Sequence, residues 1–131
     1  MYITLEADYA VRIVNCLAKN GSRMDAKALS AATGVTLRFS LKILRKLVAQ
    51  GIVRSYKGTQ GGYELARAPQ EIPLGEVIET VEGPITISRC VGGDGEFQCT
   101  RVEEGECRFN RAYAEIAKLV RDRLYAIHFG E

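Results

Sequence analysis

Hydrophobic residues recur every three or four positions near the start of the chain. Over residues 6–18, positions such as Ala10 and Val14 follow this spacing and predict an amphipathic helix, with Thr4 as its cap. A break follows at residues 20–22, and Asp25 is placed to cap a short second helix. The chain therefore begins with two helices, the second of them ending before Gly34.

The segment after Gly34 carries two rows of residues at helical spacing. The apolar row, which we expect to face inward, consists of Leu37, Leu41, Leu44 and Val48. A basic row on another face consists of Arg38, Lys42 and Arg45. The pattern predicts a basic amphipathic helix that ends at Gly51.

A glycine-rich hairpin follows this basic helix. Residues 52–56 and 63–66 have strand character, and residues 57–62 form the expected tip. A further short helix is predicted from Pro73 to Val81. Three helices with a two-stranded wing make a winged helix-turn-helix, so the fold class is mainly α with a small β wing.

The periodic pattern stops at residue 83 and resumes at Phe109. We therefore divide the chain into a winged helix-turn-helix domain (1–82), a cysteine-containing loop (83–108) and a long C-terminal dimerisation helix (109–131). A long helix outside a small core usually buries its apolar stripe against a second subunit. The alternative is a helix that folds back on its own domain.

Charge is distributed unevenly along the 131 residues, although the net charge is only +2. Residues 26–63 contain seven basic and no acidic side chains, whereas residues 64–107 contain three basic and ten acidic ones. The basic block suits a polyanion, and the alternative is a solvated surface that is unevenly charged. No apolar run is long enough for a membrane span and the start lacks a secretion signal, so we expect a cytoplasmic protein with no membrane partner.

The basic helix and the wing have the residues that duplex DNA requires. The major groove admits one helix, whose arginines can bond guanine and whose aromatic or apolar groups can contact a thymine methyl. A lysine at the wing tip can enter the minor groove, because the neighbouring glycines permit close backbone approach. The candidate DNA-binding residues are Thr36, Arg38, Phe39, Lys42, Arg45, Lys57, Gly61 and Tyr63. For Phe39, half-buried packing is the alternative, and for Arg45 it is surface solvation.

Three cysteines, Cys90, Cys99 and Cys107, lie in the unpatterned acidic loop with eight and seven residues between them. Thiolates in one glycine-rich segment are typical of iron-sulfur clusters, and a zinc site also fits these residue types. Zinc ribbons pair their cysteines more closely, which favours iron and sulfur. We expect Cys16 to be a packing residue, and His128 to lie on the surface or interface of the last helix.

Taken together, the chain resembles the IscR/NsrR-type winged-helix transcription regulators, several of which carry an iron-sulfur cluster. The resemblance spans nearly the whole chain and rests on residues 4–12, 34–37, 51–63 and 75–78 and on the cysteine loop before the final helix. It implies a homodimer that binds palindromic promoter DNA and acts mainly as a repressor. It also places the recognition contacts on Thr36, Arg38, Phe39 and Lys42, and the wing cation on Lys57.

The resemblance further implies that Cys90, Cys99 and Cys107 bind a cluster, either [2Fe-2S] or [4Fe-4S]. The fourth ligand in the family is a histidine three residues after the last cysteine or an acid near the start of the first helix of the other subunit. Asn110 occupies the histidine position here, which points to Asp8, with Glu6 as a lesser candidate. For Asp8 the alternative is a charge that interacts with the helix dipole.

Three functions are compatible with these residues. The leading hypothesis is a DNA-binding repressor whose cluster senses redox state, nitric oxide or iron-sulfur supply. The second is a cluster-free regulator of the same fold that responds through thiols or a partner protein. A small thiol or zinc enzyme is the third, and it is disfavoured because the chain lacks a C-x-x-C pair, a Walker-type loop and a Ser-His-Asp set. We therefore expect a regulator and not an enzyme.

Overall fold

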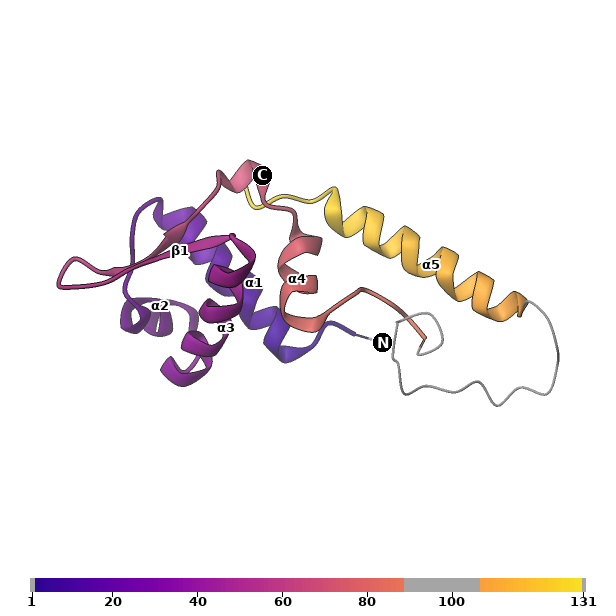
Figure 1. Cartoon of the computed structure of the whole chain (residues 1–131), viewed down its shortest axis with the longest axis horizontal. Helices are drawn as coiled ribbons and strands as arrows, with labels where there is room; N and C mark the ends of the chain where they lie inside the picture. Colours follow the sequence, from indigo (N-terminus) through magenta and orange to yellow (C-terminus); the bar gives the residue numbers. More distant parts are fainter. Residues whose placement is uncertain (1, 89–106, 131) are drawn as a thin grey trace.

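The computed structural model describes residues 2–88 and 107–130, which form helices and a two-stranded antiparallel wing (Figure 1). In chain order the elements are α1 (Leu5–Asn20), α2 (Ala26–Thr33), α3 (Leu37–Gln50), β1 (Val53–Tyr56), β2 (Gly62–Leu65), the 3-10 turn η1 (Pro69–Glu71), α4 (Leu74–Glu82) and α5 (Arg108–Tyr125). The expected fold class, mainly α with a small wing and a long C-terminal helix, is confirmed.

Side-chain caps fix the starts of α1 and α2. The hydroxyl of Thr4 accepts a hydrogen bond from the Ala7 backbone N–H at 3.2 Å, and the Asp25 carboxylate accepts one from Ala28 at 2.7 Å. Each cap satisfies a backbone donor that has no partner within the helix. Both caps were predicted from the sequence, and α3 ends at Gly51 as predicted.

The core lies where α1, α3 and α4 meet. Its buried side chains come from all three helices, from α2 and from the start of the wing, and they include Ile13, Val14, Leu17, Leu29, Ile43, Leu44, Leu47, Val53, Val77 and Ile78. Burial of aliphatic side chains on this scale is the main favourable term for folding. The core thereby holds α3 at the surface with one face outward.

The predicted inward row of α3 is wrong at its N-terminal end. Leu44 is buried, but Leu37 is 38% exposed and Leu41 is 40% exposed. The helix instead turns Ser40, Ile43 and Leu47 toward the core, together with Leu44. The hydroxyl of Ser40 donates to the Val35 carbonyl at 3.4 Å, so this small polar residue is accommodated there.

The wing pairs β1 with β2 in the register Val53↔Leu65 to Tyr56↔Gly62. Met24, in the connection between α1 and α2, extends this sheet: its N–H donates to the Tyr63 carbonyl at 2.9 Å and its carbonyl accepts from the Tyr63 N–H at 2.7 Å. The wing is therefore attached to the helical domain by backbone hydrogen bonds as well as by packing.

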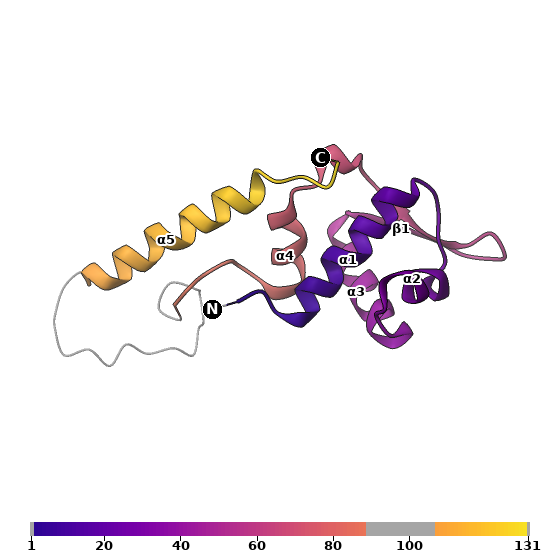
Figure 2. The same cartoon turned by 180° about the vertical axis from the view of Figure 1, so that it is seen from behind.

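Helix α5 runs outward from the domain and contacts it through α4 (Figures 1 and 2). Ala117 is the one α5 residue that is buried, whereas Phe109, Ile116, Leu119 and Val120 are 40–70% exposed. Within residues 2–88 and 107–130, no helix combines the length and apolar character that crossing a membrane requires.

Beyond α5 the chain turns back toward the start of α4. The Leu74 N–H donates to the Ile127 carbonyl at 2.7 Å, and the Phe129 N–H donates to the Ile72 carbonyl at 3.3 Å. His128 pairs with Pro73 in an isolated β-bridge. The expectation that His128 lies on the final helix is therefore wrong, since the helix ends at Tyr125.

Candidate nucleic-acid interface

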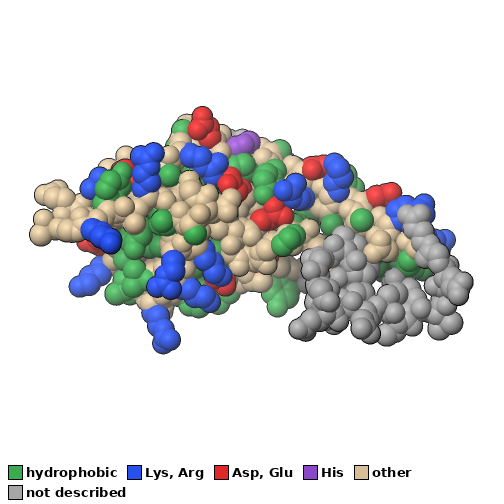
Figure 3. Space-filling view, viewed as in Figure 1, with side chains coloured by type: hydrophobic (Ala, Val, Ile, Leu, Met, Phe, Trp, Pro, Cys, Tyr) green, Lys and Arg blue, Asp and Glu red, His purple; other side chains and the backbone are tan. Residues whose placement is uncertain are grey.

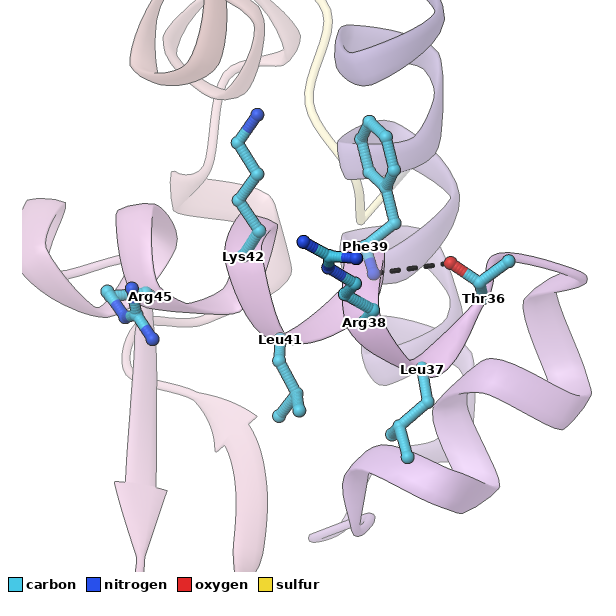
Figure 4. A pocket seen from close by; sticks show the side chains of 7 residues that line it. All are labelled: Thr36, Leu37, Arg38, Phe39, Leu41, Lys42 and Arg45. Atoms are coloured by element: carbon cyan, nitrogen blue, oxygen red, sulfur yellow. Dashed lines mark hydrogen bonds between the residues drawn. The ribbon is translucent and has the colours of Figure 1, made fainter.

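The N-terminus of α3 is exposed and well organised. Thr36 is the cap residue, and its hydroxyl oxygen accepts a hydrogen bond from the Phe39 N–H at 3.2 Å (Figure 4). The first-turn amides of a helix and its positive dipole end favour an anion such as a phosphate. Thr36 thus sets the helix start at the molecular surface, as the sequence predicts.

A basic surface extends from this helix start along α3. Arg38, Lys42 and Arg45 are all exposed and line one groove together with Thr36, Leu37, Phe39 and Leu41. In the space-filling view, Lys and Arg side chains gather over α3 on the lower left of the molecule, with hydrophobic surface beside them (Figure 3). The structure therefore brings the predicted recognition-helix cations onto one accessible face.

Phe39 belongs to the edge of this face and also to the core. Its ring is half-buried and meets the Tyr9 ring edge-on with centroids 5.4 Å apart. The Lys42 ammonium lies 5.4 Å from the centroid of the Phe39 ring. These contacts give Phe39 a packing role between α3 and α1, and its contact with a base stays a prediction.

The wing presents a cation at its tip and glycines behind it. Lys57 is exposed, and a Cβ at Gly61 would lie 2.6 Å from the Tyr56 carbonyl oxygen. Gly62 has a φ of 146°, and a Cβ there would lie 2.7 Å from the Met24 carbonyl oxygen. Side chains at these two positions would push apart the backbone segments that shape the tip.

Tyr63 pairs with the α1–α2 connection and lies beside α3. Its backbone bonds with Met24, and it lines a second groove with Leu41, Arg45, Val48 and Ser55 between α3 and the wing. The sequence placed Tyr63 among the DNA-binding residues, and the structure places it in the lining of this groove. A direct contact of Tyr63 with DNA stays a prediction.

Arg23 shapes the wing tip, although the sequence gave no sign of this role. Its guanidinium lies over the Tyr56 ring at 3.4 Å from the centroid and donates to the Gln60 carbonyl at 2.9 Å. Planar guanidinium groups favour such stacking. Because Gln60 lies 37 positions away, no local pattern could indicate this contact.

Two acidic residues at the start of α1 have different partners. The Glu6 carboxylate pairs with Lys46 at 2.8 Å and lies 3.8 Å from the Lys42 ammonium on α3. The Asp8 carboxylate pairs with Arg12 at 2.9 Å, and both of these side chains are about half exposed. Glu6 therefore contacts the basic face of α3, whereas Asp8 pairs within α1 and is about half exposed to solvent.

The cysteine site falls largely outside the described residues, since Cys90 and Cys99 lie in the segment 89–106. Cys107 is described, half-buried, at the residue that precedes α5. Among the residues that the structure does describe, no cluster of three potential metal ligands occurs. Cys16 is half-buried with its Sγ 3.9 Å from the Met24 Sδ, as expected for a packing residue.

A polar cluster fixes α5 to α4. The hydroxyl of Tyr125 donates to the Glu79 carboxylate, which also accepts from the Arg121 guanidinium at 3.2 Å and from the Ile85 N–H at 2.9 Å. Burial raises the pKa of Glu79, but these hydrogen bonds and the Arg121 charge outweigh it, so that the pKa lies below its ordinary value. Burial and the same carboxylate raise the pKa of Tyr125.

Comparison with known proteins gives a family match over residues 3–131, to the Rrf2 model described as "Iron-dependent Transcriptional regulator". The HTH-type transcriptional regulator Rv1287 of Mycobacterium tuberculosis is 37% identical over 94 residues, which cover 70% of this chain and 58% of that protein. The chain thus matches little more than half the length of this relative.

Two solved structures share the fold. The IscR structure from T. potens has a TM-score of 0.76 at 21% identity and covers 98% of this chain and 83% of its own. CymR of B. subtilis, described as a global cysteine regulator, has a TM-score of 0.76 at 22% identity, with coverage of 98% and 93%.

Proposed function

The chain belongs to the Rrf2 family of iron-dependent transcriptional regulators, and from this premise we propose that it is a homodimeric repressor whose binding to palindromic promoter DNA is controlled by an iron-sulfur cluster. The observation that carries the DNA-binding part is the exposed basic row of α3 beside a wing with a lysine at its tip. The family's description as regulators supports a role other than catalysis.

In this proposal α3 enters the major groove. Arg38 has the fork of donors that bonds guanine bidentately, and Lys42 and Arg45 reach a guanine or a phosphate. The backbone amides at the start of α3 that do not bond the Thr36 hydroxyl bind a phosphate at the helix N-terminus. Lys57 at the wing tip enters the adjacent minor groove, with Gly61 and Gly62 allowing the tip to stay narrow.

Salt dependence tests this part of the proposal. Sites are selected by the wild-type chain from random-sequence DNA duplexes, and their affinity is measured from about 50 to 200 mM salt, over which a binder with several phosphate contacts weakens by orders of magnitude. Arg38→Ala should lower affinity for the selected site more than for random DNA. Failure to retain any duplex, or binding that ignores salt, would overturn it.

The donor set for the cluster fits iron chemistry. We assign Cys90, Cys99 and Cys107 as thiolate ligands and the partner subunit's Asp8 as the fourth. Soft thiolates suit iron-sulfur clusters, and an oxygen donor holds iron less firmly, which would favour release. The half-exposed Asp8 carboxylate supports this assignment, because solvent access leaves it open to a second subunit.

When bound, such a cluster supplies redox reactivity and a link between the cysteine loop of one subunit and α1 of the other. The chain's own residues then carry the consequence to DNA. Asp8 lies on α1 two residues from Glu6, which pairs with Lys42 and Lys46 of α3. A shift of α1 would therefore change the position of the recognition helix.

Anaerobic purification with iron and sulfide assays and a visible spectrum tests the cluster. We expect Cys107→Ser and Asp8→Asn to lose or alter the absorption, whereas the controls Cys16→Ser and Glu6→Gln retain it. A colourless protein would favour the second candidate, a cluster-free regulator that responds through thiols or a partner protein. The fold shared with a global cysteine regulator is compatible with that candidate.

A further inference from the structure

Two leucines stand exposed along one edge of the basic face of α3. Leu37 and Leu41 are 38% and 40% exposed, although the other leucine, isoleucine and valine residues of this helix are buried or half-buried. Figure 4 shows both side chains pointing in the same direction from one edge of the helix, beside Arg38 and Arg45. The basic surface therefore contains a short apolar ridge.

This ridge continues toward the wing. Leu37 and Leu41 are one helical turn apart and share the main groove with Arg38 and Lys42. Leu41 also lines the second groove with Arg45, Val48, Ser55 and Tyr63. A ligand that occupies the space between α3 and the wing must cover this leucine.

The basic side chains beside the ridge indicate which kind of ligand can occupy this space. Arg38, Lys42 and Arg45 lie along one side of the ridge, so an occupant must be anionic on that side and apolar where it meets the leucines. A second copy of the same basic face would be repelled. In the major groove of DNA, the phosphates supply the anionic edge and the C5-methyl group of thymine is the apolar feature of the base edges.

We propose that Leu37 and Leu41 read thymine methyl groups, so that each half-site of the operator carries thymines at the positions these side chains reach. This inference rests on the proposed DNA binding and adds its base preference. Four residues of helix advance about 6 Å, which is close to twice the base-pair spacing of about 3.4 Å. The two contacted thymines therefore lie about one or two base pairs apart.

Replacing thymine by deoxyuridine tests the proposal, because uracil lacks only the methyl group. The probe is the duplex site selected from the random pool by the wild-type chain, with each thymine replaced one at a time. At one or two positions per half-site we expect the wild-type chain to bind about fourfold more weakly, which corresponds to one buried methyl group. Deoxyuridine outside the footprint serves as the DNA control.

Leu37→Ala and Leu41→Ala should each lose discrimination at one of these positions. Each variant should bind the duplex with uracil at that position as tightly as the duplex with thymine there. Leu41→Met keeps an apolar side chain of similar volume and should retain discrimination. Neither alanine variant should change the slope of affinity against salt, since no phosphate contact is lost. Because both leucines are exposed, thermal melting should show an intact fold.

Equal binding of thymine and uracil duplexes by the wild-type chain would overturn the proposal while leaving DNA binding intact. Discrimination that persists in both alanine variants would overturn it as well, since the methyl would then be read by another residue. A wild-type chain that binds no duplex would remove the proposed function and this inference together.

Discussion

At the scale of single residues, we expect Glu6 to oppose DNA binding. Its carboxylate holds Lys46 at 2.8 Å and approaches Lys42 at 3.8 Å, so it competes with phosphates for both cations. We expect Glu6→Gln to raise affinity for a selected duplex about two- to fivefold at low salt, and less at high salt where charges are screened. Fluorescence anisotropy at two salt concentrations measures this.

Glu115→Gln is the matched control, since it removes one negative charge from the exposed surface of α5. Its effect on affinity should be small at both salt concentrations. If both variants gain equally, the effect of Glu6 is only that of net charge. Stability should change little in either, because partly exposed ion pairs contribute at most about 1 kcal/mol.

The α3 leucines also show where residue-level prediction stops. Periodicity correctly places α3 and the exposed cations, because charged and apolar residues alternate at helical spacing. It does not fix which of two overlapping apolar rows faces the core, since Leu44 belongs to both. The choice is made by packing against α1 and α4, which favours the row through Ile43 and Leu47.

At the scale of elements, the wing depends on Arg23. Its stacking on Tyr56 and hydrogen bond to Gln60 hold the segment that carries Lys57. We expect Arg23→Ala to weaken binding to a selected duplex about three- to tenfold without changing the salt slope, since a positioning residue releases no counterions. Titrations at several salt concentrations measure both quantities.

Two comparisons separate positioning by Arg23 from a direct phosphate contact. Lys57→Ala should weaken binding and reduce the salt slope by about one. Arg23→Lys keeps the charge but loses the planar stacking, so it should resemble Arg23→Ala. A salt slope that falls by about one in Arg23→Ala would instead make Arg23 a DNA contact.

Element positions were predictable where the signals are local. Thr4, Asp25 and Gly51 mark helix ends, and the structure confirms all three. The Met24–Tyr63 pairing and the return of His128 to Pro73 join segments far apart in the chain. Such contacts depend on the finished core and leave no periodic pattern in the sequence.

At the scale of the whole molecule, we expect the attachment of α5 to α4 to depend on pH. The pKa of Glu79 is lower in the folded chain than its ordinary value of 4.5, so the unfolded chain binds more protons as pH falls below that value. This contribution to stability is present above about pH 4.5. It is lost as the pH falls through the pKa that Glu79 has in the folded chain. Thermal melting from pH 3 to 6 measures it.

Glu79→Gln should be less stable than the wild-type chain near neutral pH and should lose less stability on acidification. Tyr125→Phe removes the largest hydrogen-bond contribution to the low pKa of Glu79 and should act in the same direction. Glu115→Gln, on the exposed side of α5, should keep the wild-type acid profile. An unchanged profile in Glu79→Gln would show that other carboxylates govern the acid transition.

We expect the exposed apolar face of α5 to decide whether two recognition helices act together. Leu119 is 70% exposed near Ile116 and Val120, an arrangement that a second subunit would cover. We expect Leu119→Glu to yield monomers in sedimentation equilibrium, because an unpaired charge would be buried at the interface. The same variant should lose about tenfold or more in affinity for a palindrome while binding a single half-site as before. Lys118→Glu, which places the same charge on a neighbouring exposed position, should stay dimeric, and a dimeric Leu119→Glu would exclude this face from the interface.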